Sequence, residues 1–514
     1  MDTILILDFG SQVTQLIARR LRAMKYHSEI VPFSVSIDRI DRPEIKGIIL
    51  SGGPSSVFAK NAALPDPRIY VLGKPILGIC YGIQVLAHML GGKVARGTKR
   101  EYGKTEIKMA DGKVQETHRI FAGTPSRQNV WMSHFDIVSE LPEGFATIGS
   151  SDTSPYAAIG DAERGFFGVQ FHLEVAHTEH GAKILENFAS RICGAKAQWN
   201  SHVALDHATS LIHTIVKNRE VVHALSGGVD STVLALLLKK ALPAKRVKNI
   251  FIDNGLLRLD EAREVRLKFK SLKLKVTFID ASKKFLTALK GVTDPEIKRK
   301  IIGRIFIEVL MKNVGKADFL SQGTLYPDVI ESVSVHGPSD TIKTHHNRAP
   351  EVLALIKQGR VIEPLKELFK DEVRALGKEL GLPEDSIWRH PFPGPGLGIR
   401  ILGEITPERL QILRKADAIF IEEIKKEGHY KKISQALAAL DTSRAVGVKG
   451  DEREYGYMIL LRAITTPDFM TADWYQFPHD LLSHVASRIV NEVAGVTRVL
   501  YDITQKPPAT IEFL

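Results

Sequence analysis

The alternation of apolar runs with helical segments constrains the fold of this chain most. From Thr3 to about Gly92, the runs TILILDFG, KGIILSGG and PILGIC are apolar almost throughout. Strands of a parallel sheet have this composition because both of their faces are buried. Between the first two runs, SQVTQLIARRLRAM shows helical spacing, and we expect Ser11 to cap that helix. The order of strand, helix and strand predicts βαβ winding.

The alternation stops and restarts, which indicates separate domains. Residues 93–172 show mostly short strand-like runs, GAKAQWN (194–200) reads as a linker, and REVVHALSGG, VKNIFIDNG and KVTFIDAS then repeat the strand pattern. Three prolines and three glycines in PFPGPGLG (391–398) exclude a helix or a central strand there. At 514 residues, the chain is long enough for about three domains. We predict an α/β protein with two doubly wound, mostly parallel-sheet domains (1–195 and 196–390), followed by a smaller α+β domain (391–514).

Composition limits the environment and the partners of the chain. It has no apolar run long enough to span a membrane, and no basic leader of the secretory kind precedes its first strand. Two cysteines, Cys80 and Cys193, are too few for a disulfide framework, so we expect a reducing cytoplasm. The net charge of +11 suits anionic small molecules. The basic runs lack interleaved aromatic residues, so neither nucleic acid nor a membrane is an expected partner.

LGICYGIQ has the spacing of a nucleophile elbow around Cys80. Downstream, VQFHLEV is predicted to be a strand, which would place His172 and Glu174 on one face. Glu174 could then orient the imidazole, and His172 could take the thiol proton. For the oxyanion of such a reaction, we expect N–H donors from Tyr81 and from Gly53. The alternative is a buried cysteine that only packs, beside a core histidine.

SGGP, GICYGIQ and FHLEV together resemble the class I glutamine amidotransferases over residues 1–195. The resemblance implies that a Cys80-His172-Glu174 triad hydrolyses glutamine to glutamate and ammonia, with Gln84 at the glutamine pocket. The chain has Leu173 where the family usually has proline, and Phe135 where it often has glycine. Both positions are expected near the glutamine pocket or its gate.

SGGVDST follows a second apolar run and opens a helix, which makes an anion site from backbone N–H groups and hydroxyls. Because the Walker pattern GxxxxGK[ST] is absent, this is not an ordinary kinase or ATPase loop. With an acidic residue and hydroxyl donors instead, it suits pyrophosphate as a leaving group. A glycine turn with a capping side chain is the alternative. Asp230 is the expected Mg²⁺ ligand, and Ile252 and Asp253 end the next strand, where such sheets bind ligands. The expected ATP-binding residues are Ser226, Gly227, Gly228, Val229, Asp230, Ser231, Thr232, Ile252 and Asp253.

SGGVDS resembles the N-type ATP pyrophosphatases, and its combination with a glutaminase resembles the glutamine-hydrolysing GMP synthetase family over the whole chain. QGTLYPDVIES, IKTHHN, RHPFPGPGLGIR and KPPATIEF carry that resemblance. It implies that xanthosine monophosphate attacks ATP, that ammonia then displaces AMP to give GMP, and that the protein is a homodimer. It also implies that Lys343 neutralises phosphate charge. The residues implied for the xanthine nucleotide are Arg389, Pro393, Gly394, Lys506, Thr510, Ile511 and Glu512.

The chain departs from this family at HHNRAPEV, where a longer glycine-rich stretch is usual, and at its final Phe-Leu, where Trp-Glu is usual. Two other functions compete with the synthetase. A tRNA-modifying adenylating enzyme would bind RNA through the basic region 263–300. A non-catalytic protein on the same scaffold would not need Cys80, His172, Glu174 and Asp230, all of which are present.

Overall fold

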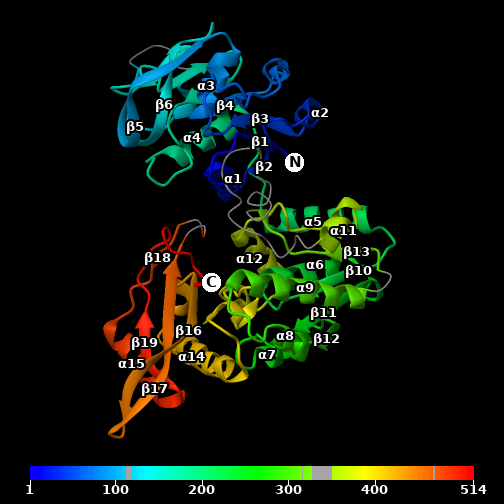
Figure 1. Ribbon diagram of the computed structural model, residues 1–514. Coiled ribbons are helices and arrows are strands. Elements are labelled where there is room, and N and C mark those ends of the chain that lie inside the picture. Colours follow the sequence, from blue (N-terminus) through cyan, green and yellow to red (C-terminus); the bar gives the residue numbers. More distant parts are fainter. Residues whose placement is uncertain (111–116, 315–316, 327–349, 467–468, 470) are drawn as a thin grey trace. The chain divides into compact units, whose positions relative to one another are not determined.

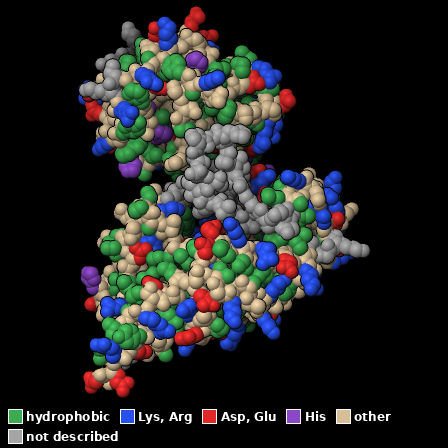
Figure 2. All heavy atoms as spheres, viewed as in Figure 1, with side chains coloured by type: hydrophobic (Ala, Val, Ile, Leu, Met, Phe, Trp, Pro, Cys, Tyr) green, Lys and Arg blue, Asp and Glu red, His purple; other side chains and the backbone are tan. Residues whose placement is uncertain are grey.

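The computed structural model describes all residues except 111–116, 315–316, 327–349, 467–468 and 470 (Figure 1). The chain divides into two compact units. The first unit is Met1–Ala204, and the second unit comprises the described residues from Leu205 to Leu514. On the face shown in Figure 2, basic and acidic side chains are interspersed over both units. None of the helices among the described residues has the length and apolar character needed to cross a membrane.

The first unit contains a nine-stranded sheet in the order β2-β1-β3-β4-β9-β8-β7-β5-β6. Its first five strands pair in parallel, which confirms the predicted βαβ winding. They are β1 (Thr3–Asp8), β2 (His27–Pro32), β3 (Ile45–Leu50), β4 (Ile76–Ile79) and β9 (Phe166–Val169). Helices α1 (Thr14–Ala23), α2 (Ile37–Ile40) and α3 (Tyr81–Met89) follow β1, β2 and β4. Ser11 does not cap α1, because the helix begins later, at Thr14.

The other half of this sheet is antiparallel. Its strands are β5 (Lys93–Met109), β6 (Arg127–Glu140), β7 (Ala146–Ser150) and β8 (Ala158–Asp161). We predicted short strands here, but β5 and β6 have 17 and 14 residues. Residues 194–200 form no helix or strand, as predicted. Before them, α4 (Gly181–Asn187) continues into a π-helical turn, Phe188–Ile192.

The second unit begins with a five-stranded, fully parallel sheet in the order β12-β11-β10-β13-β14. Its strands are β10 (Val221–Leu225), β11 (Val247–Asp253), β12 (Val276–Asp280), β13 (Phe319–Ser321) and β14 (Val361–Ile362). The helices of this part of the chain are α5 (Ser201–Val216), α6 (Val229–Ala241), α7 (Glu261–Ser271), α8 (Ser282–Ala288), α9 (Pro295–Val314), α11 (Pro350–Lys357), α12 (Lys370–Glu379) and α13 (Glu384–Ile387).

An irregular segment, 391–395, leads to a short 3-10 helix, Gly396–Ile399, and then to an α+β region. The prediction that the prolines and glycines of 391–398 exclude a helix was therefore wrong for the end of this stretch, where one 3-10 turn forms after the last proline. The strands of the α+β region are β15 (Ile401–Leu402), β16 (Gln435–Lys449), β17 (Glu452–Thr465), β18 (Asp473–Trp474) and β19 (Val496–Tyr501). Its helices are α14 (Pro407–Lys426) and α15 (His479–Glu492), and α14 packs against β16 (Figure 1). One cluster of buried side chains joins this region to the parallel sheet and includes Val222, Ile250, Leu413 and Ile459. This shared core explains why both sheets belong to one compact unit.

Candidate functional site

Cys80 occupies a sharp turn between β4 and α3. Its φ of +54° is a left-handed conformation that residues with a side chain rarely adopt. The positions on either side, Gly78 and Gly82, have no room for a larger side chain. A Cβ at Gly78 would lie 2.5 Å from the carbonyl oxygen of Gly82, and one at Gly82 would lie 2.1 Å from that of Leu50. The turn predicted from the G-x-C-x-G spacing is confirmed.

His172 and Glu174 lie together beside this turn. Glu174 accepts a hydrogen bond from His172 at an Nδ1–Oε1 distance of 2.7 Å, and its side chain is fully buried. Burial alone would lower the pKa of His172. The hydrogen bonds to Cys80 and Glu174 outweigh burial and raise that pKa well above its ordinary value of 6.5. The three side chains therefore have the contacts of a nucleophile, a base and an orienting carboxylate.

The predicted reason for this pairing was wrong. His172 and Glu174 are not on a strand, because β9 ends at Val169. Tertiary contacts hold the segment instead. The backbone N–H of His172 donates to the Trp131 carbonyl at 3.0 Å, and Thr178 Oγ1 donates to the His172 carbonyl at 2.5 Å. A loop bound to β6, rather than the alternation of side chains along a strand, thus places His172 next to Glu174.

The end of β3 lies against the elbow. A Cβ at Gly52 would be 3.3 Å from His172 Cε1, and one at Gly53 would be 3.2 Å from the Tyr81 ring. Gln84, expected in the glutamine pocket, is buried and donates its amide N–H to the Asp136 carbonyl at 2.7 Å. The Cys80 thiol donates to the Ser133 carbonyl at 3.7 Å.

The two unusual residues of this region have different environments. Leu173 is fully buried, and its carbonyl would lie 2.1 Å from a Cβ at Gly181. Phe135 lies under the Arg100 guanidinium at 5.6 Å. The sequence analysis missed a buried contact next to Phe135, in which His134 Nε2 is 3.2 Å from Glu101 Oε2. These residues are 33 positions apart in the chain, on β5 and β6, and no local pattern signals their pairing.

The SGGVDST loop joins β10 to α6 and forms a cup of polar groups. Ser226 Oγ lies 3.0 Å from Ser231 Oγ and accepts a hydrogen bond from the Gly228 N–H at 3.3 Å. Thr232 Oγ1 donates to the Gly228 carbonyl at 2.7 Å. N–H groups and hydroxyls at a helix start form a site that favours anions.

Asp230 is paired with Lys370, which the sequence analysis missed. Lys370 is the first residue of α12, and its Nζ lies 2.6 Å from each carboxylate oxygen of Asp230. Among the described residues, no group of three or more His, Cys, Asp or Glu side chains could hold a metal ion. A single carboxylate still fits Mg²⁺, because this ion is commonly held by one or two carboxylates and by substrate phosphates.

His223 on β10 contacts the loop, and the sequence analysis missed it as well. It is fully buried, with Nδ1 2.8 Å from Ser321 Oγ and Nε2 2.8 Å from the Ser231 carbonyl. Burial lowers the pKa of His223 to about 4, so the ring is neutral at physiological pH. At the next strand end, Ile252 is buried and Asp253 accepts a hydrogen bond from the Gly255 N–H at 2.8 Å. The loop is therefore anchored to the sheet rather than loosely attached.

The residues implied for the xanthine nucleotide have several different partners. Arg400 donates two hydrogen bonds to Glu512, at 2.9 and 2.8 Å, and Gln435 donates a third at 2.7 Å. Thr510 accepts at its carbonyl from Arg462. Arg389 forms an ion pair with Glu261. Neighbouring Pro393 and Gly394 lie in the irregular segment before β15, and Ile511 precedes Glu512 in a bend near the chain's end.

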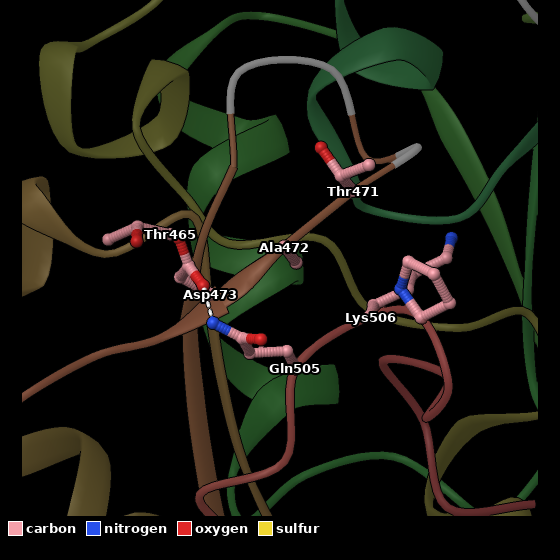
Figure 3. Close-up of a pocket in the computed structure, with 7 residues that line it drawn as sticks. Thr465, Thr471, Ala472, Asp473, Gln505 and Lys506 are labelled. Atoms are coloured by element: carbon pink, nitrogen blue, oxygen red, sulfur yellow. Dashed lines mark hydrogen bonds between the residues drawn. The ribbon is translucent and has the colours of Figure 1, made fainter. Parts of the chain in front are cut away.

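Lys506 donates to the Phe469 carbonyl at 2.7 Å and lines an open pocket of about 270 Å³ (Figure 3). Gln505 and Asp473 lie on the same wall and are joined by a hydrogen bond of 2.6 Å (Figure 3). The pocket is lined by Thr465, Thr471, Ala472, Asp473, Gln505, Lys506 and Pro507. Lys343 and the HHN segment lie outside the described residues.

Three family models match separate parts of the chain. The family model "Glutamine amidotransferase class-I" matches residues 5–192, "NAD synthase" matches residues 205–324, and "GMP synthase C terminal domain" matches residues 422–513. Curated relatives match over nearly their whole length. The protein of Aquifex aeolicus is 52% identical, with 99% of each chain covered, and that of Chlorobium phaeovibrioides is 50% identical, with 100% of each covered. Both are described as "GMP synthase [glutamine-hydrolyzing]", as is the protein of Eremothecium gossypii, which is 51% identical, with 100% of this chain and 98% of that one covered.

Proposed function

The chain belongs to the glutamine-hydrolysing GMP synthase family, and from this premise we propose how its two polar sites share one reaction. It is a carbon–nitrogen ligase that aminates xanthosine 5′-monophosphate to GMP, with glutamine as the nitrogen donor. ATP activates the xanthine nucleotide and leaves as AMP and pyrophosphate. The observation that carries the proposal is Cys80, held at positive φ beside the buried His172–Glu174 pair.

At the first site, the Cys80 sulfur attacks the glutamine amide carbon and forms a thioester. His172 takes the thiol proton and delivers it to the departing ammonia, and Glu174 keeps the imidazole in place. The raised pKa of His172 supports this role, because it means that the imidazole holds the proton firmly once it has taken it. Backbone N–H groups of Gly53 and Tyr81 stabilise the oxyanion, and Gln84 shapes the glutamine pocket. Water then releases glutamate.

At the second site, O2 of the xanthine ring attacks the ATP α-phosphate, and pyrophosphate leaves into the cup of Ser226–Thr232. Asp230 would hold Mg²⁺ there together with phosphate oxygens, and the ion would neutralise charge on the leaving group. Because Lys370 lies against both oxygens of Asp230, Mg²⁺ would compete with Lys370 for this carboxylate. Lys370 and Lys343 then remain as cations for the phosphates. Ile252 and Asp253, at the end of β11, contribute to the nucleotide site.

For the xanthine nucleotide, we propose a site built from the irregular segment and the chain's last residues. Glu512 can accept a base N–H in addition to its present partners, because the two carboxylate oxygens offer about four lone-pair positions in total and three are used. Lys506 and Arg389 supply positive charge for the 5′-phosphate. Pro393, Gly394, Thr510 and Ile511 complete the site.

We propose the domain boundaries 1–195, 196–390 and 391–514, and a homodimer that forms through the last domain. The β16–β17 hairpin supports this dimer, since Val446, Val448 and Tyr455 are 44%, 73% and 59% exposed, and Val446 lies opposite Tyr455 in the register. An exposed apolar group of this kind fits a second copy of the chain. Val448→Asp should shift the protein toward monomer in light scattering, whereas an unchanged mass would place the dimer interface elsewhere.

The protein should work in the cytoplasm, since two cysteines are too few for a disulfide framework. Its partners are small molecules.

The direct test of the function is to supply xanthosine monophosphate, ATP, Mg²⁺ and glutamine and to identify the products. GMP, AMP and pyrophosphate are expected. ADP and phosphate as the main nucleotide products would overturn the assignment of the SGGVDST loop.

A further inference from the structure

The SGGVDST loop contains no lysine, but helix α7 supplies one from outside the motif. Lys268 Nζ donates a hydrogen bond to the carbonyl oxygen of Gly227 at 2.7 Å. Burial, together with the nearby charge of Arg389, lowers the pKa of Lys268 to about 8, against the opposing effect of Glu261 and Glu264. The amine is therefore still protonated at neutral pH, and its hydrogen bond is charge-assisted.

Helix α7 contacts the loop at two positions one turn apart. Gly227 has a φ of +81°, and a Cβ at this residue would lie 2.8 Å from Val265 Cγ2. Val265 and Lys268 are three residues apart in the helix, so they project from the same face. Val265 therefore packs against the turn, while Lys268 holds its carbonyl.

The peptide group between Gly227 and Gly228 explains what this contact achieves. Because a trans peptide is planar, its C=O and its N–H point in opposite directions. The Gly227 carbonyl points to Lys268, and the Gly228 N–H points to Ser226 Oγ, which belongs to the polar cup. A peptide between two glycines meets little steric resistance to reversal. Reversal would present a carbonyl oxygen, the negative end of the dipole, to the cup.

We infer that Lys268 is a positioning residue for pyrophosphate and ATP, which holds the Gly227–Gly228 peptide with its N–H facing the anion. The inference rests on the proposed function of the SGGVDST loop as the pyrophosphate site. Lys268 acts through the backbone and is not required to touch the phosphates. Its loss should therefore weaken binding of ATP and pyrophosphate, and it should leave the xanthine nucleotide and the glutaminase site unaffected.

The test compares three variants by ammonium-dependent GMP formation. Lys268→Met keeps the aliphatic stem and removes the donor. We expect its KM for ATP and its inhibition constant for pyrophosphate to rise about tenfold, the usual loss of one charge-assisted hydrogen bond. Its kcat at saturating ATP and its KM for xanthosine monophosphate should stay within about twofold of the parent values, since the reacting groups are untouched. Lys268→Arg, which keeps a charged donor, should restore most of the ATP affinity.

Lys270→Met is the matched control, because Lys270 is an exposed lysine of the same helix. It should leave all four constants unchanged. A Lys268→Met enzyme with parental KM for ATP would overturn the inference. So would an Arg variant as impaired as the Met variant, since only packing would then matter. Failure of the loop assignment itself is separable, because Asp230→Ala would then retain activity, whereas failure for Lys268 alone leaves Asp230→Ala inactive.

Discussion

At the scale of single residues, the role proposed for Asp230 predicts the same defect with glutamine and with ammonium, because the metal and the leaving group would serve both reactions. Its carboxylate is held by Lys370 in this structure and would pass to Mg²⁺ when ATP binds. We predict that Asp230→Ala lowers GMP synthesis at least about 100-fold with either glutamine or ammonium, the usual cost of removing one electrostatic stabiliser of the transition state. Initial rates with each nitrogen source measure this. Near-normal turnover would place the Mg²⁺ site at other residues.

A second residue-scale prediction concerns a glycine that no turn requires. Gly303 lies inside α9, and a Cβ at this position would meet no atom within 4 Å. Gly303→Ala should stabilise the second unit by about 0.5–1 kcal/mol, because alanine loses less backbone entropy in a helix. The melting temperature should rise by a few degrees.

At Gly82 we predict the opposite effect. The Cβ of Gly82→Ala would overlap the Leu50 carbonyl, so this substitution should lower both the stability and the glutaminase activity.

At the scale of elements, His223 joins β10 to β13 and to the loop that opens α6. Its pKa is lowered to about 4 in the folded state, against an ordinary value of 6.5. The unfolded state therefore binds more protons in this interval. The contribution of neutral His223 to the free energy of unfolding is therefore complete above pH 6.5. It is lost as the pH falls toward 4, by up to about 1.4 kcal/mol per pH unit.

His223→Asn removes that titration, so its melting temperature should fall less steeply between pH 6.5 and 4 than that of the parent. His390, whose pKa is also lowered to about 4, remains in both proteins and contributes equally. Melting curves at half-unit pH steps give the comparison. Parallel pH profiles of the two proteins would show that His223 does not titrate as stated.

The elements also show where prediction from sequence succeeds. The Cys80 elbow and the SGGVDST loop were predicted because each depends on neighbours within a few residues, such as the glycines that the turn geometry requires. Lys370 and Asp230 are 140 positions apart, and they meet only because α12 packs on α6. His223 and Lys268 were missed for the same reason. The His172–Glu174 pair was predicted for a strand, whereas contacts to Trp131 and Thr178 hold it in a loop.

At the scale of the whole molecule, Cys80, His172 and Glu174, which we propose for the glutaminase site, belong to the first unit, and the SGGVDST loop belongs to the second. Nothing in the loop depends on the Cys80 sulfur. Cys80→Ala should therefore lose about 10⁴-fold or more of its glutamine-dependent GMP synthesis and keep most of its activity with ammonium salts. Ammonium-dependent activity should rise with pH, because NH₃ rather than NH₄⁺ is the nucleophile. Glu174→Ala should lose less than Cys80→Ala, since an orienting group contributes less than the nucleophile.

Cys193→Ala is the control for this last comparison, because Cys193 is the chain's other thiol and packs against Gly47, away from the elbow. It should retain activity with both nitrogen sources. Retained glutamine activity in Cys80→Ala would make Cys80 a packing residue and remove the basis of the first site. An equal loss of ammonium activity would show that chemistry in the second unit requires an intact first unit. Selective loss of the glutamine reaction is the outcome that two chemically separate sites require.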